Sequence, residues 1–259
     1  MKNPYLKNLE KIEFVMTYAC TGRCKHCSEG EHSLNGDMLD ARKGADSVRK
    51  ICSEYDIKTV MVFGGEPLLH PEAVRLIMRE ARKMNVPRRQ IITNGYFTRD
   101  REKMREIAFM LSDAGVNDLL LSTDAFHQET IPLDTVREFA AEIKAVGVPM
   151  RLQPAWLVSE ENDNVYNRKT REILDSFSDM QIPVSVGNVI FPEGNALKYL
   201  SEYFAEEPPK NPYTEDPCDV KCVSIEPNGD TLGRNVYEND IIDIIRNYAP
   251  SDALLGCIQ

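Results

Sequence analysis

The chain has 259 residues, of which 42% are hydrophobic and 28% are charged. This length and composition are typical of a globular protein with one sizeable core and, at most, a small appended module. The net charge of −10 argues against a protein that binds nucleic acid, because a phosphate backbone requires a basic face.

Strand and helix patterns alternate along the chain, which predicts a parallel α/β architecture. Apolar runs predict strands at residues 13–18, 59–63, 90–93, 118–122, 148–153 and 183–190. Amphipathic segments between and after them predict helices over residues 37–55, 71–84, 99–114, 133–146 and 165–177. In barrels built from such parallel strand–helix units, the active groups come from the carboxyl ends of the strands and from the loops that follow them.

The sequence also indicates the compartment of the protein. No run approaches the ~18 apolar residues of a membrane helix, so we expect no membrane partner. Residues 1–7 lack the apolar core of a signal peptide, which favours a cytoplasmic protein. In that compartment the seven cysteines are expected to be metal ligands or free thiols rather than disulfides.

Three of these cysteines form a short motif directly after the first predicted strand. Cys20, Cys24 and Cys27 have the spacing C-x3-C-x2-C. Three converging thiolates favour zinc or an iron–sulfur cluster. A structural zinc site normally has four protein ligands in two separated pairs, whereas three thiolates around a four-iron cluster leave one iron open. A zinc-binding module, with His26 as a fourth ligand, is the alternative, and metal analysis distinguishes the two.

This loop resembles that of the radical S-adenosylmethionine (SAM) superfamily, in which the three cysteines hold a [4Fe-4S] cluster whose open iron is chelated by SAM. A second match lies after the second predicted strand, where Gly64, Gly65, Glu66 and Pro67 resemble the family's GGEP motif. The resemblance implies that these four residues bind SAM and that the fold is a partial (β/α)6 TIM-like barrel. It also implies an electron donor such as flavodoxin or ferredoxin.

Further cofactor contacts are implied at the ends of three other strands. Thr93 and Asn94 belong to a segment that resembles the family's TNG sequence near SAM, although Asn94-Gly95 is equally typical of a plain turn. Ser122 is expected beside the ribose of SAM, and Gln153 is expected to make a polar contact with SAM.

The loop after the fourth strand carries the candidate catalytic residues. Ser122-Thr123-Asp124 resembles the S-x-D segment of peptide-modifying members of the family. Asp124 is expected either to face the substrate or to order the loop through an Asx turn. His127 either acts on the substrate or has a structural role. After the sixth strand, residues 192–196 resemble the P-x-G-x-A segment whose backbone lies along the adenine.

The remaining 59 residues, 201–259, resemble the SPASM or twitch extension of radical SAM peptide maturases, and residues 1–200 form the predicted barrel domain. The expected extension is a hairpin turning at Asn228-Gly229 followed by a helix over residues 240–248. Cys218, Cys222 and Cys257 hold an auxiliary iron–sulfur cluster, form a remnant without metal, or serve redox or hydrogen-donor chemistry. Arg234 occupies the position where a further ligand cysteine is expected.

The resemblance implies an enzyme, an iron–sulfur oxidoreductase of the maturase type. One electron cleaves SAM at the [4Fe-4S] cluster, and the resulting 5′-deoxyadenosyl radical abstracts a hydrogen atom from the substrate. A peptide undergoing crosslinking or epimerisation, such as a ribosomal natural-product precursor, is the expected substrate. Only about ten residues precede the first predicted strand, too few for a leader-peptide-binding module, so a small molecule such as a sugar or an amino acid is the alternative. A non-catalytic iron–sulfur protein is the hypothesis from a different class.

Overall fold

The computed structural model describes residues 2–205 and 209–250, and its centre is one parallel sheet of six strands. The sheet has the order β5-β4-β3-β2-β1-β8, and every neighbouring pair is parallel. Its strands are β1 (Lys11–Val15), β2 (Thr59–Phe63), β3 (Arg88–Thr93), β4 (Asp118–Ser122), β5 (Met150–Gln153) and β8 (Cys222–Ile225). The described residues form an open sheet, which agrees with the predicted partial barrel.

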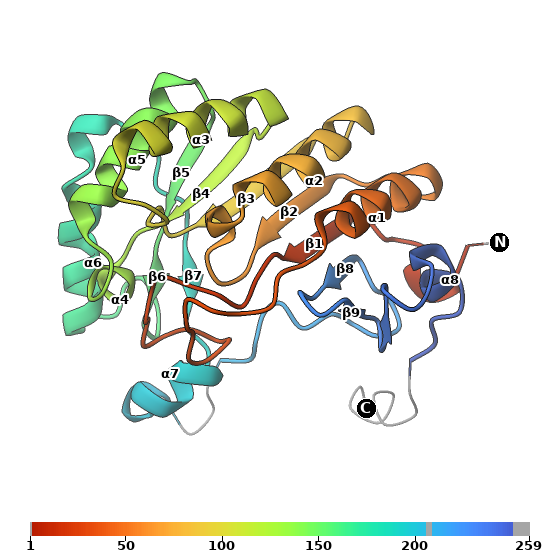
Figure 1. The fold of residues 1–259 in the computed structure, drawn as a ribbon. Helices are drawn as coiled ribbons and strands as arrows, with labels where there is room; N and C mark the ends of the chain where they lie inside the picture. Colours follow the sequence, from red (N-terminus) through yellow and green to blue (C-terminus); the bar gives the residue numbers. More distant parts are fainter. Residues whose placement is uncertain (1, 206–208, 251–259) are drawn as a thin grey trace.

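Helices that connect successive strands lie along one side of this sheet (Figure 1). The longest are α1 (Ala41–Glu54), α2 (Pro71–Lys83), α3 (Arg101–Ala114), α5 (Leu133–Ala145) and α6 (Val165–Asp175). Shorter helices are α4 (Ala125–Gln128), α7 (Gly194–Tyr199), α8 (Ile241–Arg246), and the 3-10 turns Pro4–Leu6, Pro67–Leu69, Ser178–Met180 and Ser201–Tyr203. No helix in the described ranges is both long enough and apolar enough to cross a bilayer.

The core of the protein lies between the sheet and these helices. Phe14 of β1, Ile51 of α1, Ile77 of α2, Leu111 of α3 and Phe139 of α5 are all fully buried in one hydrophobic cluster. Their positions follow from the pattern of the sequence, because each helix presents a single apolar stripe to a sheet that is apolar on the facing side. The sheet is thereby held rigid beneath the loops at its carboxyl edge.

The cap residues explain where the helices begin, and they shorten two predicted helices. The helix predicted from residue 37 starts at Ala41 because the Asp40 carboxylate accepts hydrogen bonds from the N–H groups of Arg42 and Lys43. Asp100 caps the helix predicted from residue 99 in the same way. That helix ends at Gly115, whose φ of 85° is the left-handed conformation that glycine adopts most readily.

The predicted sixth strand over residues 183–190 is only partly formed. A single parallel bridge joins Val184 to Leu152 of β5, and the chain then forms β7 (Asn188–Val189), which pairs with β6 (Ala155–Trp156). The segment therefore follows β5 around the barrel, but the sixth strand of the main sheet is β8.

The C-terminal segment differs from the predicted hairpin in its pairing. β8 joins the main sheet beside β1, so it is not one arm of a separate hairpin (Figure 1). The chain does turn at Gly229, but the antiparallel pair is β9 (Asp230–Thr231) with β10 (Arg234–Asn235), which turns at Leu232-Gly233. α8 begins one residue after the predicted start and ends two residues before the predicted end. The division into a barrel at 1–200 and an extension at 201–259 stays a prediction.

Candidate active site

The cysteine loop leaves the carboxyl end of β1, and its thiols lie close together. Cys20 and Cys24 are buried and Cys27 is partly buried. The sulfurs of Cys20 and Cys24 flank Gly22, because a Cβ on Gly22 would lie 3.7 Å and 3.3 Å from them. The Gly22 N–H donates to Cys20 Sγ at 3.3 Å. A side chain at position 22 would fill the space between two sulfurs, and glycine keeps that space open.

Burial sets the protonation state of these thiols in the absence of a metal. Burial, with the nearby Glu66 carboxylate, raises the pKa of Cys20 to about 12. Burial also raises the pKa of Cys24 well above its usual range, with contributions from Asp124 and the other two cysteines, and raises the pKa of Cys27. Buried thiols of this kind lose their protons when a thiophilic metal binds to the sulfurs. The donor set therefore suits metal ligation better than nucleophilic chemistry.

Glu66 connects the cysteine loop, the segment after β2 and the segment after β3. Its side chain is fully buried and accepts hydrogen bonds from Leu68 N–H at 2.9 Å, Thr93 Oγ1–H at 2.8 Å and Asn94 N–H at 2.8 Å. Its own N–H donates to Ala19 O at 2.8 Å. Both carboxylate oxygens are thus used inside the protein, so Glu66 orders the loops and leaves backbone atoms of this segment to meet a ligand.

The two glycines before Glu66 allow this close approach. Gly65 has a φ of 26°, and a Cβ at this position would lie 2.1 Å from Ala19 O. Asn94 completes the connection, since its Nδ2–H group donates to Cys20 Sγ at 3.6 Å and to Thr21 Oγ1 at 3.2 Å. The predicted sites at 64–67, 93–94 and the cysteine loop are therefore in direct contact.

The protonation of Glu66 predicts a pH dependence of stability. Burial raises the pKa of Glu66 from 4.5 to about 7, even though three donors to its oxygens favour the charged form. Between these values Glu66 binds more protons in the folded chain than in the unfolded chain, so the stability that this group contributes is fully present below pH 4.5 and is lost as pH rises through 7. We expect the metal-free protein to lose roughly 3 kcal/mol from this group across that window. Urea unfolding at several pH values should show a flatter dependence for Glu66→Gln, and equal slopes would contradict the prediction.

The loop after β4 is ordered by Asp124. Its fully buried carboxylate accepts from Phe126 N–H at 2.9 Å and His127 N–H at 3.0 Å, which caps α4. The other oxygen accepts from His127 Nδ1–H at 2.8 Å and from Ala155 N–H at 3.1 Å. Burial alone would raise the pKa of Asp124, but the charge and hydrogen bonds of His127 outweigh it and hold the pKa at about 2. Of the two predicted roles, the structure gives Asp124 the ordering one, and its contact with substrate stays a prediction.

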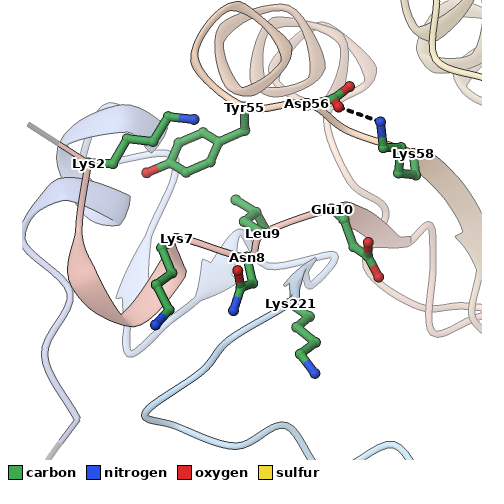
Figure 2. Close-up of a pocket in the computed structure, with 9 residues that line it drawn as sticks. All are labelled: Lys2, Lys7, Asn8, Leu9, Glu10, Tyr55, Asp56, Lys58 and Lys221. Atoms are coloured by element: carbon green, nitrogen blue, oxygen red, sulfur yellow. Dashed lines mark hydrogen bonds and ion pairs between the residues drawn. The ribbon is translucent and has the colours of Figure 1, made fainter.

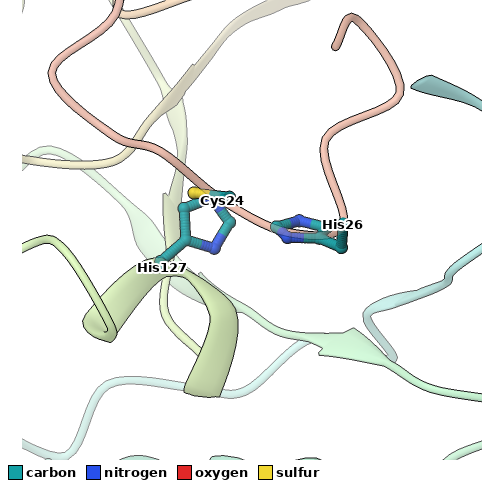
Figure 3. Close-up of side chains that lie close together, drawn as sticks. All are labelled: Cys24, His26 and His127. Carbon is teal, nitrogen blue, oxygen red and sulfur yellow. The ribbon is translucent and has the colours of Figure 1, made fainter. Parts of the chain in front are cut away.

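His127 lies beside the cysteine loop. Ligand atoms of Cys24, His26 and His127 all lie within 4.8 Å of one another, and Figure 3 shows the His127 ring of α4 next to the Cys24 sulfur. The rings of His26 and His127 meet edge to face with their centroids 4.8 Å apart. Burial lowers the pKa of His26 to about 4, and its Nδ1 is buried without a hydrogen-bond partner. The ring of His26 also packs against Phe126, so His26 belongs to the wall of the site.

The segment of residues 192–196, which follows the sixth predicted strand, is hydrogen-bonded to the cysteine loop. Asn195 N–H donates to Cys27 O at 2.8 Å, and Asn195 Nδ2–H donates to Cys24 O at 3.0 Å. Gly194 has a φ of 52°, and a Cβ there would lie 2.3 Å from Ser28 O and 2.6 Å from Cys27 O. The predicted contact of this segment with adenine stays a prediction.

This contact predicts that Gly194→Ala disturbs the cysteine loop. The added methyl group would displace two backbone carbonyls, which we expect to cost about 1–3 kcal/mol and to lower the iron bound per chain. Gly147→Ala is the matched control, because Gly147 has a φ of 72° and nothing lies within 4 Å of its Cβ position. Iron analysis and thermal unfolding should separate the two variants. Equal iron contents and equal Tm values would contradict the prediction.

Comparison with known proteins decides the family. The family model of the Radical SAM superfamily matches residues 14–195, which is more than half of the chain and includes the cysteine motif and Gly64-Gly65-Glu66-Pro67. The chain belongs to the radical SAM superfamily. This membership makes the protein an enzyme and implies a [4Fe-4S] cluster and SAM as cofactors.

Curated relatives match a large part of the chain. A protein of Sulfolobus acidocaldarius named probable GTP 3′,8-cyclase is 32% identical over 171 residues, which are 62% of this chain and 51% of the relative. A protein of Saccharolobus islandicus with the same name is 26% identical over 212 residues, which are 75% of this chain and 64% of the relative. The chain thus spans between half and two thirds of the length of these relatives.

Solved structures share the fold at low sequence identity. SuiB of Streptococcus suis, solved with S-adenosylmethionine, has a TM-score of 0.59 at 13% identity and covers 98% of this chain and 69% of its own. The anSMEcpe structure with bound AdoMet has a TM-score of 0.55 at 15% identity, covering 93% of this chain and 81% of its own. Likeness at this level shows the fold, and it agrees with the open parallel sheet.

The residues present fit a cluster bound by three thiolates. Cys20, Cys24 and Cys27 are the predicted ligands, and Gly22 leaves the space between the sulfurs of Cys20 and Cys24 open. Membership also makes a zinc module of three cysteines and His26 the weaker interpretation, because His26 packs against Phe126 and His127. Thr93, Asn94 and Glu66 lie beside the cysteine loop, and their predicted contacts with SAM stay predictions.

The two other predicted SAM contacts, Ser122 and Gln153, and the tail cysteines lie outside the network around Glu66. Ser122 and Gln153 face each other across the ends of β4 and β5, and Gln153 Oε1 accepts from Ser185 Oγ–H. Cys222 begins β8 opposite Lys11, at the amino end of β1, whereas the cluster loop follows the carboxyl end. Cys218 is half-buried, and Cys257 lies outside the described residues. The auxiliary cluster stays a prediction.

A separate cavity of about 470 Å³ lies at the same amino end of the sheet (Figure 2). Its walls include Glu10, Lys58 and Lys221, which immediately precede β1, β2 and β8. The loops with the SAM motifs are at the opposite, carboxyl ends of the strands, so this cavity is distinct from the radical SAM site.

Two residues near the cluster loop were not found from the sequence. The side chain of Asn195 holds the Cys24 carbonyl, and His32 Nε2 lies 3.1 Å from Cys27 Sγ. Asn195 falls inside the segment 192–196, but it occupies a variable position of the P-x-G-x-A pattern, so the pattern does not distinguish it. His32 is a single histidine in a polar loop, and no local pattern distinguishes such a residue from an exposed one.

Proposed function

We propose that the protein cleaves SAM reductively and uses the 5′-deoxyadenosyl radical to abstract a hydrogen atom from a carbon of its substrate. The observation that carries the proposal is the network centred on Glu66. The Glu66 carboxylate accepts from Thr93 and Asn94, and the Glu66 backbone N–H donates to Ala19 O, so that two SAM-motif segments are held against the cysteine loop. Such an arrangement would bring a SAM molecule and an open iron to one place. A zinc module or an iron–sulfur cluster that does not use SAM has no need of this arrangement.

The chain's own residues then have distinct tasks. A bound [4Fe-4S] cluster supplies the single electron that cleaves the sulfonium bond of SAM to methionine and the radical. Cys20, Cys24 and Cys27 hold the cluster, while the backbone of Gly64 and Gly65 binds SAM and Glu66 fixes that backbone. Asp124 orients His127 beside the cluster loop, where the imidazole helps to exclude water from the radical. An electron donor of the flavodoxin or ferredoxin type completes the proposal.

The test is SAM cleavage by anaerobically reconstituted protein. With dithionite as the reductant, we expect 5′-deoxyadenosine and methionine to form in equal amounts. Metal analysis of the same sample identifies the alternatives. Zinc without sulfide would support a zinc module, and four irons without SAM cleavage would support a non-catalytic iron–sulfur protein.

We propose a peptide as the substrate, because an extended segment on the open side of the sheet is exposed and apolar. Val184, Val186 and Val189 are 49%, 85% and 38% exposed. Within the described residues, β7 pairs in a backbone ladder with β6 alone, and Tyr213 Oη–H donates to Asn188 Oδ1 at 2.6 Å. A free edge with apolar side chains is the surface that binds peptides by β-augmentation. The peptide would be crosslinked or epimerised.

A nucleotide is the second candidate substrate, and the curated relatives favour it, since those proteins carry the name probable GTP 3′,8-cyclase. Deuterium transfer distinguishes the candidates. Deuterated GTP, or deuterated peptides encoded near the gene, are incubated with the enzyme and undeuterated SAM. Deuterium in 5′-deoxyadenosine identifies the substrate class, and transfer from GTP alone would overturn the peptide proposal.

A further inference from the structure

The cavity at the amino end of the sheet gathers positive charge in a chain whose net charge is −10. Its volume of about 470 Å³ lies in the range of small-molecule sites. The charged residues of its lining are four lysines and two acids, namely Lys2, Lys7, Lys58, Lys221, Glu10 and Asp56. The cavity therefore differs in sign from the protein as a whole.

The negative charges lie on one side of this cavity. Asp56 forms an ion pair with Lys58, and Asp219, which is not part of the lining, lies 3.7 Å from the Lys221 ammonium group. Figure 2 shows Glu10 on the same side as Lys58, far from Lys2 and Lys7. The lysines on that side are thus balanced by carboxylates, and the unbalanced charge is that of Lys2 and Lys7.

Three hydrogen-bond donors on the other side have no acceptor. Within residues 2–205 and 209–250, the ammonium groups of Lys2 and Lys7 form neither an ion pair nor a hydrogen bond. The side chain of Tyr55 is only 4% exposed, and its hydroxyl has no hydrogen-bond partner in the same ranges. Figure 2 shows this hydroxyl directed to the side of Lys2 and Lys7. A buried hydroxyl without a partner is rare, and a bound ion is one of the things that explain it.

The walls of the cavity are held in place by the backbone of the sheet and of α1. Glu10 N–H donates to Lys221 O at 3.0 Å, and Lys58 N–H donates to Glu10 O at 2.7 Å. Tyr55 is the C-cap of α1, and its N–H donates to Ile51 O at 2.8 Å. The carboxyl end of that helix carries about half a negative charge, which is less than the two ammonium groups add.

We propose that this cavity binds the phosphate group of a small molecule through Lys2, Lys7 and the Tyr55 hydroxyl. A phosphate group has acceptor oxygens for all three donors and carries close to two negative charges at neutral pH. Lysine binds such a group as a point charge. The Lys2 ammonium lies over the Tyr55 ring, 4.9 Å from its centroid, so its movement toward the anion also uncovers the hydroxyl. The site requires neither the cluster nor SAM, and it is therefore independent of the proposed function.

The test is calorimetric titration of the anaerobically reconstituted full chain with pyrophosphate and with ADP at constant ionic strength. We expect both probes to bind saturably, and Lys2→Gln/Lys7→Gln to bind them at least about tenfold more weakly. Tighter binding of ADP would identify an organic phosphate as the ligand, and equal affinities would identify the free anion. Lys103→Gln is the control, because Lys103 lies on α3, pairs with Glu106 and does not line the cavity.

Tyr55→Phe separates a binding role from a structural one. The hydroxyl that it removes has no partner within the described ranges, so the free variant should keep the Tm of the wild type, whereas its affinity for pyrophosphate should fall several-fold.

Three results would overturn the inference. They are the absence of saturable binding of both probes, equal affinities of the wild type and Lys2→Gln/Lys7→Gln, and an unchanged affinity of Tyr55→Phe. SAM cleavage by the same samples reports separately on the proposed function.

Discussion

Replacing Cys20, Cys24 and Cys27 together by alanine is expected to abolish SAM cleavage and to remove about four irons and four sulfides per chain. The reason is the geometry of the loop after β1, in which Cys20 and Cys24 are buried with their sulfurs on either side of Gly22, and Cys27 is partly buried. The measurement is iron and sulfide analysis after anaerobic reconstitution, with 5′-deoxyadenosine as the activity readout. A triple variant that retained SAM cleavage would refute the assignment of the ligands.

Cys52→Ala is the control for this experiment, because Cys52 lies on α1 and packs against the hydrophobic core. It should keep the iron of the wild type. The same analysis tests the tail cysteines. About eight irons in the wild type, falling to about four in the triple variant, would indicate an auxiliary cluster held by Cys218, Cys222 and Cys257. About four falling to none would leave the tail without one.

Asp124→Ala is expected to destabilise the protein by about 3–5 kcal/mol, because it removes a fully buried carboxylate that accepts four hydrogen bonds. The N-cap of α4 is lost, and Ala155 N–H and the His127 imidazole are left without their partner. SAM cleavage should fall about tenfold through misplacement of His127. Chemical denaturation and the rate of 5′-deoxyadenosine formation measure the two effects.

Two further variants define the origin of this loss. Asp124→Asn keeps an oxygen that caps α4, so its loss of stability should be smaller. Asp113→Ala removes a carboxylate that pairs with Arg79 at the surface, where its side chain is 64% exposed, and it should change stability by less than about 1 kcal/mol. If Asp124→Ala were as mild as Asp113→Ala, the buried network would not contribute as described.

The parts of the fold that could be predicted are those decided by neighbouring residues. The strands at Thr59–Phe63 and Asp118–Ser122 have the predicted bounds, because both are short apolar runs bounded by polar or glycine residues. The end of α3 at Gly115 was predictable for a similar reason. The ligand cysteines were identifiable because their spacing places three thiols in one loop.

The parts that could not be predicted depend on partners distant in sequence. Cys222–Ile225 has the pattern of a strand, and the nearby Asn228-Gly229 favours a local hairpin, but the strand pairs with β1 instead. The segment 183–190 has β-prone residues and yet forms one bridge to β5. The role of Glu66 differs for the same reason, because two of its three donors, Thr93 and Asn94, come from a distant segment and help to turn its carboxylate inward.

The pairing of β8 with β1 has a consequence for biosynthesis. Lys11–Phe14 finds its outer partner more than two hundred residues later in the chain, so the ribosome adds all the intervening residues before that partner appears. Until then, the hydrogen-bonding groups on the outer edge of β1 are unpaired and can capture another nascent chain. The partly exposed charges of Lys11 and Glu13 on that strand reduce this hazard. β1 is thus made long before its outer edge is paired, and chaperones should be needed most at that edge of β1 during translation.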